Sequence, residues 1–182
     1  RVQHKPQLRG QFGLHSTATQ KRVALAGEDV GQRAYKVARI QLQPQTENVF
    51  TVFKEGWHPA EIADHNATIE WQWTKKDATL SFKNPKKDAL FYLDVDNPGS
   101  VFTEPQRVTI TLGGQVVDEF SLKPGQPELR KVPFKAAQFG TGDVAEVVIS
   151  VDKTYVPAVL TPGNKDPREL GVRVFHAYVD TR

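Results

Sequence analysis

The chain has 182 residues, of which 25 % are charged and 38 % are hydrophobic, and it carries a formal net charge of +3. This composition is typical of a globular domain, and no apolar run approaches the roughly 18 residues that a membrane-spanning helix needs. The lack of cysteine excludes disulfide bonds, thiol catalysis and thiolate metal sites. Because the chain begins with Arg1 and contains no methionine, we expect it to be part of a longer protein.

Residues 1–36 are predicted to form a basic, polar arm or linker that could contribute an edge strand. Residues 1–39 hold eight lysines and arginines against two acidic residues. A basic arm of this kind can contact nucleic acid or anionic lipid. The cations here are scattered and are not interleaved with aromatic residues, so we expect a solvated lead-in and no nucleic-acid partner.

Residues 37–182 are predicted to form one all-β domain. The predicted strands are 37–43, 49–54, 68–73, 78–82, 89–95, 107–112, 115–122, 145–151 and 171–179. Turn-forming segments such as "DNPGS", "LGGQ" and "KPGQP" separate them. This pattern predicts a two-sheet antiparallel β-sandwich, jelly-roll-like, with at most one short helical turn, for which "PAEIADHN" is the candidate.

The strand 68–73 carries Trp71 and Trp73 on one face. A pair of indoles on a sheet can stack on a sugar ring, but large aromatic side chains more often fill a core. We therefore expect Trp71 and Trp73 in the core. The same periodicity predicts burial of Ile69, Leu80 and Phe82.

Trp57 follows Gly56 at the mouth of a loop. Its indole could be an exposed platform for a sugar ring, whose axial C–H groups suit an aromatic plane, or it could belong to the core. The segment "HPAEIADH" next to it offers the nitrogen and oxygen atoms of His58 and Glu61. Its spacing does not match the zinc-binding helix with two histidines four residues apart, so we expect no metal and no other cofactor.

The segment "NKDPRELGV" clusters Asp166, Arg168 and Glu169 before the last predicted strand. Arg168 could form a two-bond ion pair with a carboxylate such as Glu61 and so hold two loops together. This structural role is favoured over clamping a ligand.

Patterns that mark enzymes are absent from the sequence. It has no G-x-S-x-G elbow and no glycine-rich phosphate loop, and nothing in the spacing of its acids selects a catalytic pair. We therefore expect a non-catalytic domain. A glycoside hydrolase or lyase is a third hypothesis, which a carboxylate pair across a groove would support.

Four segments appear in a recognisable order: "EGWHPAE", "WQWTKKDATLSFKNP", "VTITLGGQVVDEFSL" and "YVPAVLTPGNKDPRELGVRV". Over residues 49–180 this order resembles the extracytoplasmic β-sandwich at the C-terminal end of some bacterial multi-pass membrane glycosyltransferases. That pattern is matched by Trp57, Glu61, Trp73, Asp166, Arg168, Leu170 and Gly171. It is not matched at Gln72, where an arginine often precedes the tryptophan.

The resemblance implies a non-catalytic accessory domain that is attached to its parent membrane protein on the extracytoplasmic side. We expect weak recognition of a glycan or glycolipid through Trp57, His58, Glu61, Asp166 and Arg168. The alternative is a structural module that docks on its parent membrane domain without binding sugar.

Overall fold

The structure is a computed structural model that describes residues 28–29, 35–36, 49–64 and 66–181. The chain divides into two compact units, residues 1–41 and 42–182. In the first unit, β1 (Glu28–Asp29) pairs antiparallel with β2 (Tyr35–Lys36). The predicted strand 37–43 lies outside the described residues, and the expected boundary between residues 36 and 37 stays a prediction.

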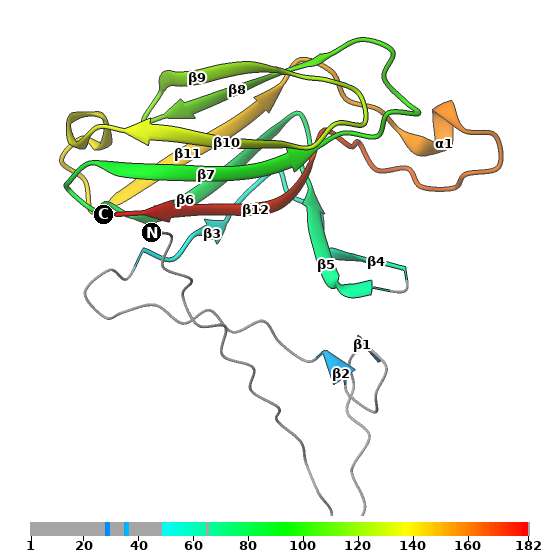
Figure 1. Ribbon diagram of the computed structural model, residues 1–182, viewed down its shortest axis with the longest axis horizontal. Coiled ribbons are helices and arrows are strands. Elements are labelled where there is room, and N and C mark those ends of the chain that lie inside the picture. Colours follow the sequence, from blue (N-terminus) through cyan, green and yellow to red (C-terminus); the bar gives the residue numbers. More distant parts are fainter. Residues whose placement is uncertain (1–27, 30–34, 37–48, 65, 182) are drawn as a thin grey trace, which may run out of the picture. The chain divides into compact units, whose positions relative to one another are not determined.

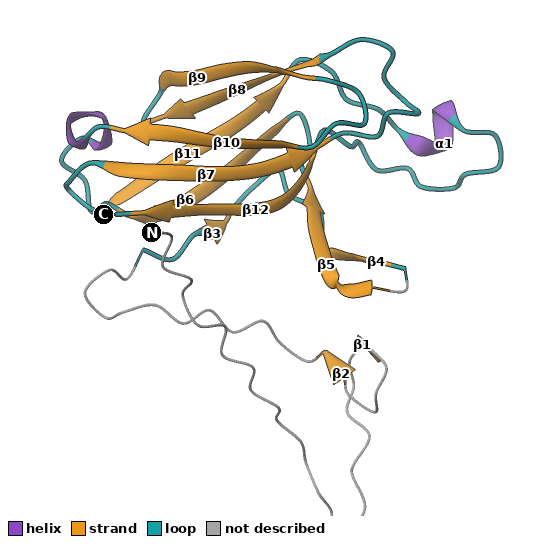
Figure 2. Ribbon diagram, in the orientation of Figure 1, coloured by secondary structure: helices purple, strands orange, loops and turns teal. Residues whose placement is uncertain are grey.

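The second unit is a sandwich of two five-stranded antiparallel sheets (Figures 1 and 2). The first, which we name sheet I, has the strand order β10-β7-β12-β5-β4, and sheet II has the order β3-β6-β11-β8-β9. The strands of sheet I are β4 (Glu61–Ala63), β5 (Asn66–Trp73), β7 (Ala89–Asp96), β10 (Glu128–Phe134) and β12 (Arg173–Asp180). The strands of sheet II are β3 (Val52–Phe53), β6 (Asp77–Lys83), β8 (Gln106–Leu112), β9 (Gln115–Leu122) and β11 (Val144–Val151). The orders β5-β12-β7-β10 and β6-β11-β8-β9 make a jelly roll of eight strands, so the predicted fold class is confirmed.

The two sheets share one hydrophobic core. In β7 the side chains of Phe91, Leu93 and Val95 are fully buried, while the residues between them are partly exposed. Ile110 on β8 and Ile149 on β11 bury their side chains in the same core from sheet II. Because strand side chains alternate between the two faces, every second residue enters this core. Each such burial contributes about 2 kcal/mol.

Helices are short throughout the described part of the chain. The 3-10 turn η1 (Ala136–Phe139) and the single turn α1 (Pro157–Leu160) have four residues each. Among the described residues, no helix has the length and apolar character needed to cross a membrane. The helical turn expected in "PAEIADHN" is wrong, because Glu61–Ala63 forms β4 and pairs with β5 instead.

The strand β10 has no counterpart among the predicted strands. Its sequence "ELRKVPF" combines charged residues with Pro133, and proline cannot donate a hydrogen bond to a neighbouring strand. The strand is tolerated because it forms an edge of sheet I and pairs with β7 alone. Pro133 and the charged residues are therefore the reason why the sequence pattern did not predict this edge strand.

The apolar face of β5 does not enter the core between the sheets, which corrects the expectation for its side chains. Ile69 is 43 % exposed and Trp71 is partly exposed. Trp73 is buried, but it packs against Tyr155 and not within the shared core cluster. The expectation for Leu80 and Phe82 is confirmed, because both belong to that cluster.

Candidate functional site

The outer side of sheet I is defined by the register of three strands. Asp96 on β7 lies opposite Arg173 on β12, and Arg173 lies opposite Trp73 on β5. Because Val95 points into the core, Asp96 and its cross-strand neighbours point outward. Trp71, two residues before Trp73, shares this direction. The sheet therefore gathers a carboxylate, a guanidinium and two indoles on its outer side. The backbone of this region, where the end of β5 meets the start of β12, can be followed in Figure 1.

Arg173 lies at the centre of this group. Its Nε and Nη2 atoms donate to the Asp96 carboxylate at 2.7 and 2.6 Å, which is a two-bond pairing. Its guanidinium carbon lies 5.4 Å from the ring centroid of Trp71 and 5.6 Å from the centroids of Trp73 and Phe175. These distances are within the range of cation–π attraction. No hydrogen bond between described residues uses the Nη1 group, so it can donate to a ligand.

Trp71 supplies apolar surface to the site. Phe175 packs edge-on against it, with ring centroids 6.1 Å apart and an interplanar angle of 61°. The indole Nε1 of Trp71 is buried and has no hydrogen-bond acceptor among the described residues. The exposed part of this side chain is therefore carbon, which suits the C–H groups of a sugar ring. The register of β12 with β7 shifts between Val174 and His176, so the regular alternation of side chains between the two faces of the sheet is interrupted at Phe175.

A second charged group lies on the β4 side of this surface. Glu61 on β4 lies opposite Trp71, which places it on the outer side of sheet I as well. The Nη1 of Arg168 donates to Glu61 Oε1 at 2.5 Å, and its Nε and Nη2 donate to Asp166 at 2.9 and 2.6 Å. The expected pair of Arg168 with Glu61 is confirmed, although the two-bond pairing goes to Asp166. Arg168 thus ties the β4–β5 hairpin to the loop that precedes β12.

Tyr155 connects the two charged groups. Its ring packs edge-on against Trp73 at 6.0 Å and against Phe102 at 5.7 Å. Burial raises the pKa of the Tyr155 phenol to about 12, and the charges of both arginines and of Glu61 and Asp166 also act on it. The two arginine pairs also meet at Trp71, because Glu61 lies opposite Trp71 and the Arg173 guanidinium lies 5.4 Å from its ring. This phenol stays protonated at neutral pH.

The carboxyl group of Asp166 gives a prediction about pH. The hydrogen bonds from Arg168 hold the pKa of Asp166 at about 2, below its ordinary value of 3.8. The folded-state pKa lies below the unfolded one, so the stabilisation from this pairing is present above about pH 4 and is lost as the pH falls towards 2. We expect Asp166 to titrate near pH 2 by carbon-detected NMR, and Arg168→Gln to raise its pKa towards the ordinary value.

The control for this titration is Lys86→Gln. Lys86 pairs with Asp143 in an exposed ion pair that shares no residue with the site. This exchange should leave the pKa of Asp166 unchanged. An Asp166 that keeps its low pKa in Arg168→Gln would contradict the assigned cause.

Two of the five residues expected to contact a ligand, Trp57 and His58, make hydrogen bonds or ring contacts within the fold. His58 is 9 % exposed, and its Nε2 donates to the backbone carbonyl of Glu169 at 2.7 Å. Trp57 lies apart from the arginine pairs, since its Nε1 donates to the carbonyl of Thr79 at 2.8 Å and its ring packs on Phe53 at 4.6 Å. A ligand role for Trp57 or His58 stays a prediction. Of the expected set, the structure brings Glu61, Asp166 and Arg168 together at the surface.

Sequence reasoning did not find Asp96, Tyr155, Arg173 and Phe175. Asp96 and Arg173 are 77 positions apart, and only the pairing of β7 with β12 brings them together. A local signal was available in "RVFHAYV", where Arg173 and Phe175 are two residues apart in a predicted strand. That spacing places an arginine and an aromatic ring close together, which is a common arrangement for cation–π contact.

The site offers aromatic carbon, N–H donors and carboxylate acceptors. The hydrogen bonds from Arg168 hold the pKa of Asp166 below its ordinary value, so this carboxyl is ionised at neutral pH and acts as a hydrogen-bond acceptor. Within the described ranges, no group of three or more His, Asp or Glu side chains is placed to hold a metal ion. The arrangement is suited to binding a neutral, hydroxyl-bearing ring.

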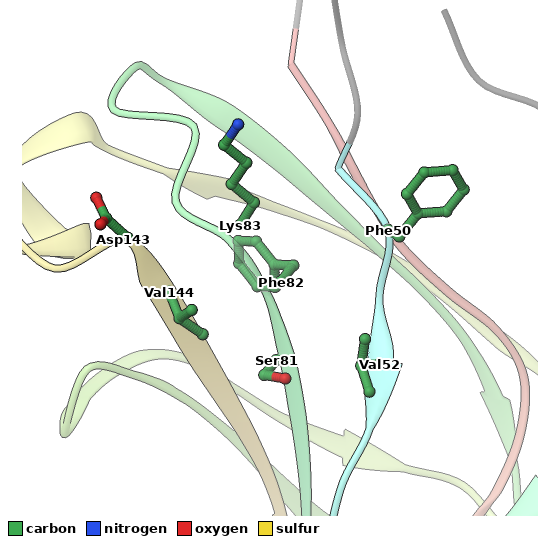
Figure 3. Close-up of a pocket in the computed structure, with 7 residues that line it drawn as sticks. All are labelled: Phe50, Val52, Ser81, Phe82, Lys83, Asp143 and Val144. Atoms are coloured by element: carbon green, nitrogen blue, oxygen red, sulfur yellow. The ribbon is translucent and has the colours of Figure 1, made fainter. Parts of the chain in front are cut away.

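Sheet II carries an open groove of about 570 Å³ beside β3 (Figure 3). The groove is lined by Phe50, Val52, Ser81, Phe82, Lys83, Asp143 and Val144. Phe50, Val52 and Val144 are 41, 50 and 60 % exposed. The groove is therefore a mainly apolar surface that belongs to a different sheet from the arginine pairs.

No protein-family model matches the chain, and no curated protein matches it. Among solved structures, the chain is similar to a family GH115 4-O-methyl-α-glucuronidase with specificity for decorated arabinogalactans, with a TM-score of 0.48 and 14 % identity. That match covers 83 % of this chain and 20 % of the glucuronidase, so the chain spans a fifth of the enzyme's length.

The chain is also similar to two family 35 carbohydrate-binding modules. For the module from an environmental isolate the TM-score is 0.45 and the identity 10 %, covering 73 % of this chain and 93 % of the module. For the module from Clostridium thermocellum the values are 0.41 and 9 %, covering 73 % and 99 %. Similarity of this size does not say what this chain binds, so its function is inferred from the geometry of the site.

Proposed function

We propose that the chain is a non-catalytic carbohydrate-binding domain that holds a glycan, or the glycan part of a glycolipid, weakly on the outer side of sheet I. The observation that carries this proposal is the placement of Trp71 and Phe175 around Arg173 on the outside of the sandwich. A fold gains most from large aromatic side chains when it buries them in its core. Aromatic rings on an outer sheet face beside a guanidinium are instead typical of a binding surface.

The proposed contacts follow from the atoms that remain available. One face of a sugar ring packs on the exposed carbon of Trp71. A ring hydroxyl accepts from Nη1 of Arg173, and another donates to Oε2 of Glu61, which accepts no hydrogen bond from a described residue. Because ion pairs already hold both arginines in place, binding orders few side chains.

A glycan array with the purified domain tests this proposal. We expect binding to a subset of neutral glycans, and we expect Trp71→Ala to weaken it at least about tenfold, the equivalent of roughly 1.4 kcal/mol. The matched control is Ile69→Ala, which changes an exposed apolar residue on the same side of β5. This control should bind as the unchanged domain does.

Two outcomes would contradict the proposal. The first is no signal from a domain whose circular dichroism and thermal unfolding show a folded state. The second is an equal loss of glycan affinity in Trp71→Ala and Ile69→Ala, because the indole of Trp71 would then have no particular role in binding.

The cellular setting is a separate proposal, and the motif resemblance supports it. In this proposal the domain is an accessory part of a membrane glycosyltransferase and lies on the extracytoplasmic side, next to the parent membrane domain. Protease added outside cells in which the cytoplasmic membrane is intact should then digest the domain in the full-length protein. Protection until that membrane is opened would exclude this side.

The alternative function is a module that docks on its parent without binding sugar, and the groove of sheet II is the surface that such docking would use. Exposed apolar side chains of the kind found at Phe50, Val52 and Val144 mark contact surfaces when they gather in one place. In that case Val52→Glu should weaken association with the parent membrane domain in co-purification, and Trp71→Ala should not. The reverse result would favour the glycan surface.

A further inference from the structure

We infer that the outer surface of sheet I selects uncharged sugars and discriminates against sugars that carry a carboxylate, sulfate or phosphate group. This inference rests on the proposed function and names the ligand class of the same site. It follows from how the two arginines are occupied, from the charge of the site and from the groups that remain available.

Both guanidinium groups are already bound to carboxylates of the chain. Nε and Nη2 of Arg173 both donate to Asp96. Nε and Nη2 of Arg168 both donate to Asp166, and its Nη1 donates to Glu61. An arginine recognises an acidic ligand most strongly through two parallel N–H bonds, and one such edge of each arginine is taken. An acidic sugar would have to compete with carboxylates that are covalently part of the fold.

The charge balance also opposes an acidic ligand. Two guanidinium groups face the three carboxylates of Glu61, Asp96 and Asp166, which gives these ion pairs a net charge of −1. Asp94 adds a further carboxylate two residues along β7, where it contacts the exposed His176. Placing another negative charge next to this group adds like-charge repulsion to the cost of removing the anion from water.

The groups that remain available match an uncharged ring. They are the exposed carbon of Trp71, the Nη1 donor of Arg173 and the second oxygen of Glu61. A hydroxyl group can accept from an N–H and donate to a carboxylate, whereas a carboxylate can only accept. An acidic group near Glu61 would therefore find a second acceptor where it needs a donor.

Matched pairs of glycans on one array test the inference. The probes are oligomers of glucose, galactose and mannose, printed beside oligomers of glucuronic, galacturonic and mannuronic acid with the same linkages. We expect each neutral oligomer that binds to exceed its acidic counterpart by at least about tenfold in affinity, as like-charge contact predicts. Titration calorimetry with the best pair gives the affinities.

Charge-removing variants test the cause. Glu61→Gln and Asp96→Asn keep the shape of the side chain and remove one negative charge each. Each variant should therefore reduce the difference in binding affinity between neutral and acidic oligomers. The matched control is Asp118→Asn, which breaks a similar two-bond pair with Arg130 between β9 and β10, outside the site. This control should leave the difference unchanged.

The outcomes separate this inference from the proposed function. Equal or stronger binding of the acidic oligomers overturns the inference and leaves glycan binding in place. No binding to any oligomer by the folded, unchanged domain removes the proposed function and the inference together. If Glu61→Gln and Asp96→Asn both keep the full difference in affinity between neutral and acidic oligomers, the charge-based cause is wrong. The discrimination would then come from shape.

Discussion

Replacing Gly56 by alanine is expected to lower the free energy of unfolding by about 3 kcal/mol or more. Gly56 has a φ angle of +81°, in the left-handed region that favours glycine. A Cβ atom there would overlap the backbone oxygen of Asp77 and lie 2.8 Å from the Cα of Ala78. The backbone angle costs about 1–2 kcal/mol for a residue with a Cβ, and forcing apart packed backbone costs about 1–3 kcal/mol more.

This position matters because Gly56 follows β3 in the chain and its backbone is hydrogen-bonded to the segment that follows β5. Its carbonyl accepts from the backbone N–H of Lys75 at 2.7 Å, and the neighbouring Glu55 carbonyl accepts from Thr79 at 2.9 Å. A shift of the chain here would displace the residues that precede β4, and with them Glu61. Equilibrium unfolding in urea measures the change.

Gly114→Ala is the matched control for Gly56→Ala. Gly114 has a nearly identical φ angle of +82°, but no atom lies within 4 Å of the position that a Cβ would take. This control should lower the free energy of unfolding only by the cost of the backbone angle, about 1–2 kcal/mol. Equal losses in the two variants would show that the close approach to Asp77 contributes nothing.

Arg173→Met is expected to abolish glycan binding and to lower the free energy of unfolding by about 2 kcal/mol. The substitution leaves the Asp96 carboxylate, whose side chain is only 13 % exposed, without its cation. Breaking a fully buried pair costs about 3–5 kcal/mol, and we expect less here because the arginine side chain is 28 % exposed. The three aromatic rings around the guanidinium also lose their cation–π contacts.

Arg130→Met is the control that separates stability from binding. Arg130 donates through Nε and Nη2 to Asp118 at 3.0 and 2.8 Å, and its guanidinium lies 4.8 Å from the ring centroid of Phe120. Arg130 thus repeats the chemistry of Arg173 outside the proposed site. We expect a comparable loss of stability with unchanged glycan binding, measured by urea unfolding and calorimetry. Loss of binding in both variants would mean that general destabilisation explains the effect.

The sandwich could be predicted from the sequence because its signals are local. The alternation of β7, β8 and β11 is visible in short segments, and the turns between them contain Gly, Pro or Asn. The sequence also suggested the pair between Arg168 and Glu61, because an arginine in a polar segment usually pairs with a carboxylate, but it did not show that the two-bond pairing goes to Asp166.

The orientation of β5 could not be predicted from its own residues. Its apolar face satisfies the pattern of a core-facing strand, and the pattern is the same whichever side of the sheet the residues occupy. The register of Trp73 with Arg173, and of Arg173 with Asp96, decides the side. Such pairings join residues far apart in the chain, so the aromatic part of the site emerges only from the three-dimensional fold.

The wide sequence separation of these pairs has a consequence for the order of events during synthesis. Arg168 follows Glu61 by 107 positions, so at about 5–20 residues per second it leaves the ribosome roughly 5–20 s later. Arg173 comes later still and opens β12, the central strand of sheet I. The proposed glycan-binding surface is therefore complete only when β12 completes sheet I, and a nascent chain that still lacks β12 exposes Trp71 without the Arg173 that lies beside it in the folded domain.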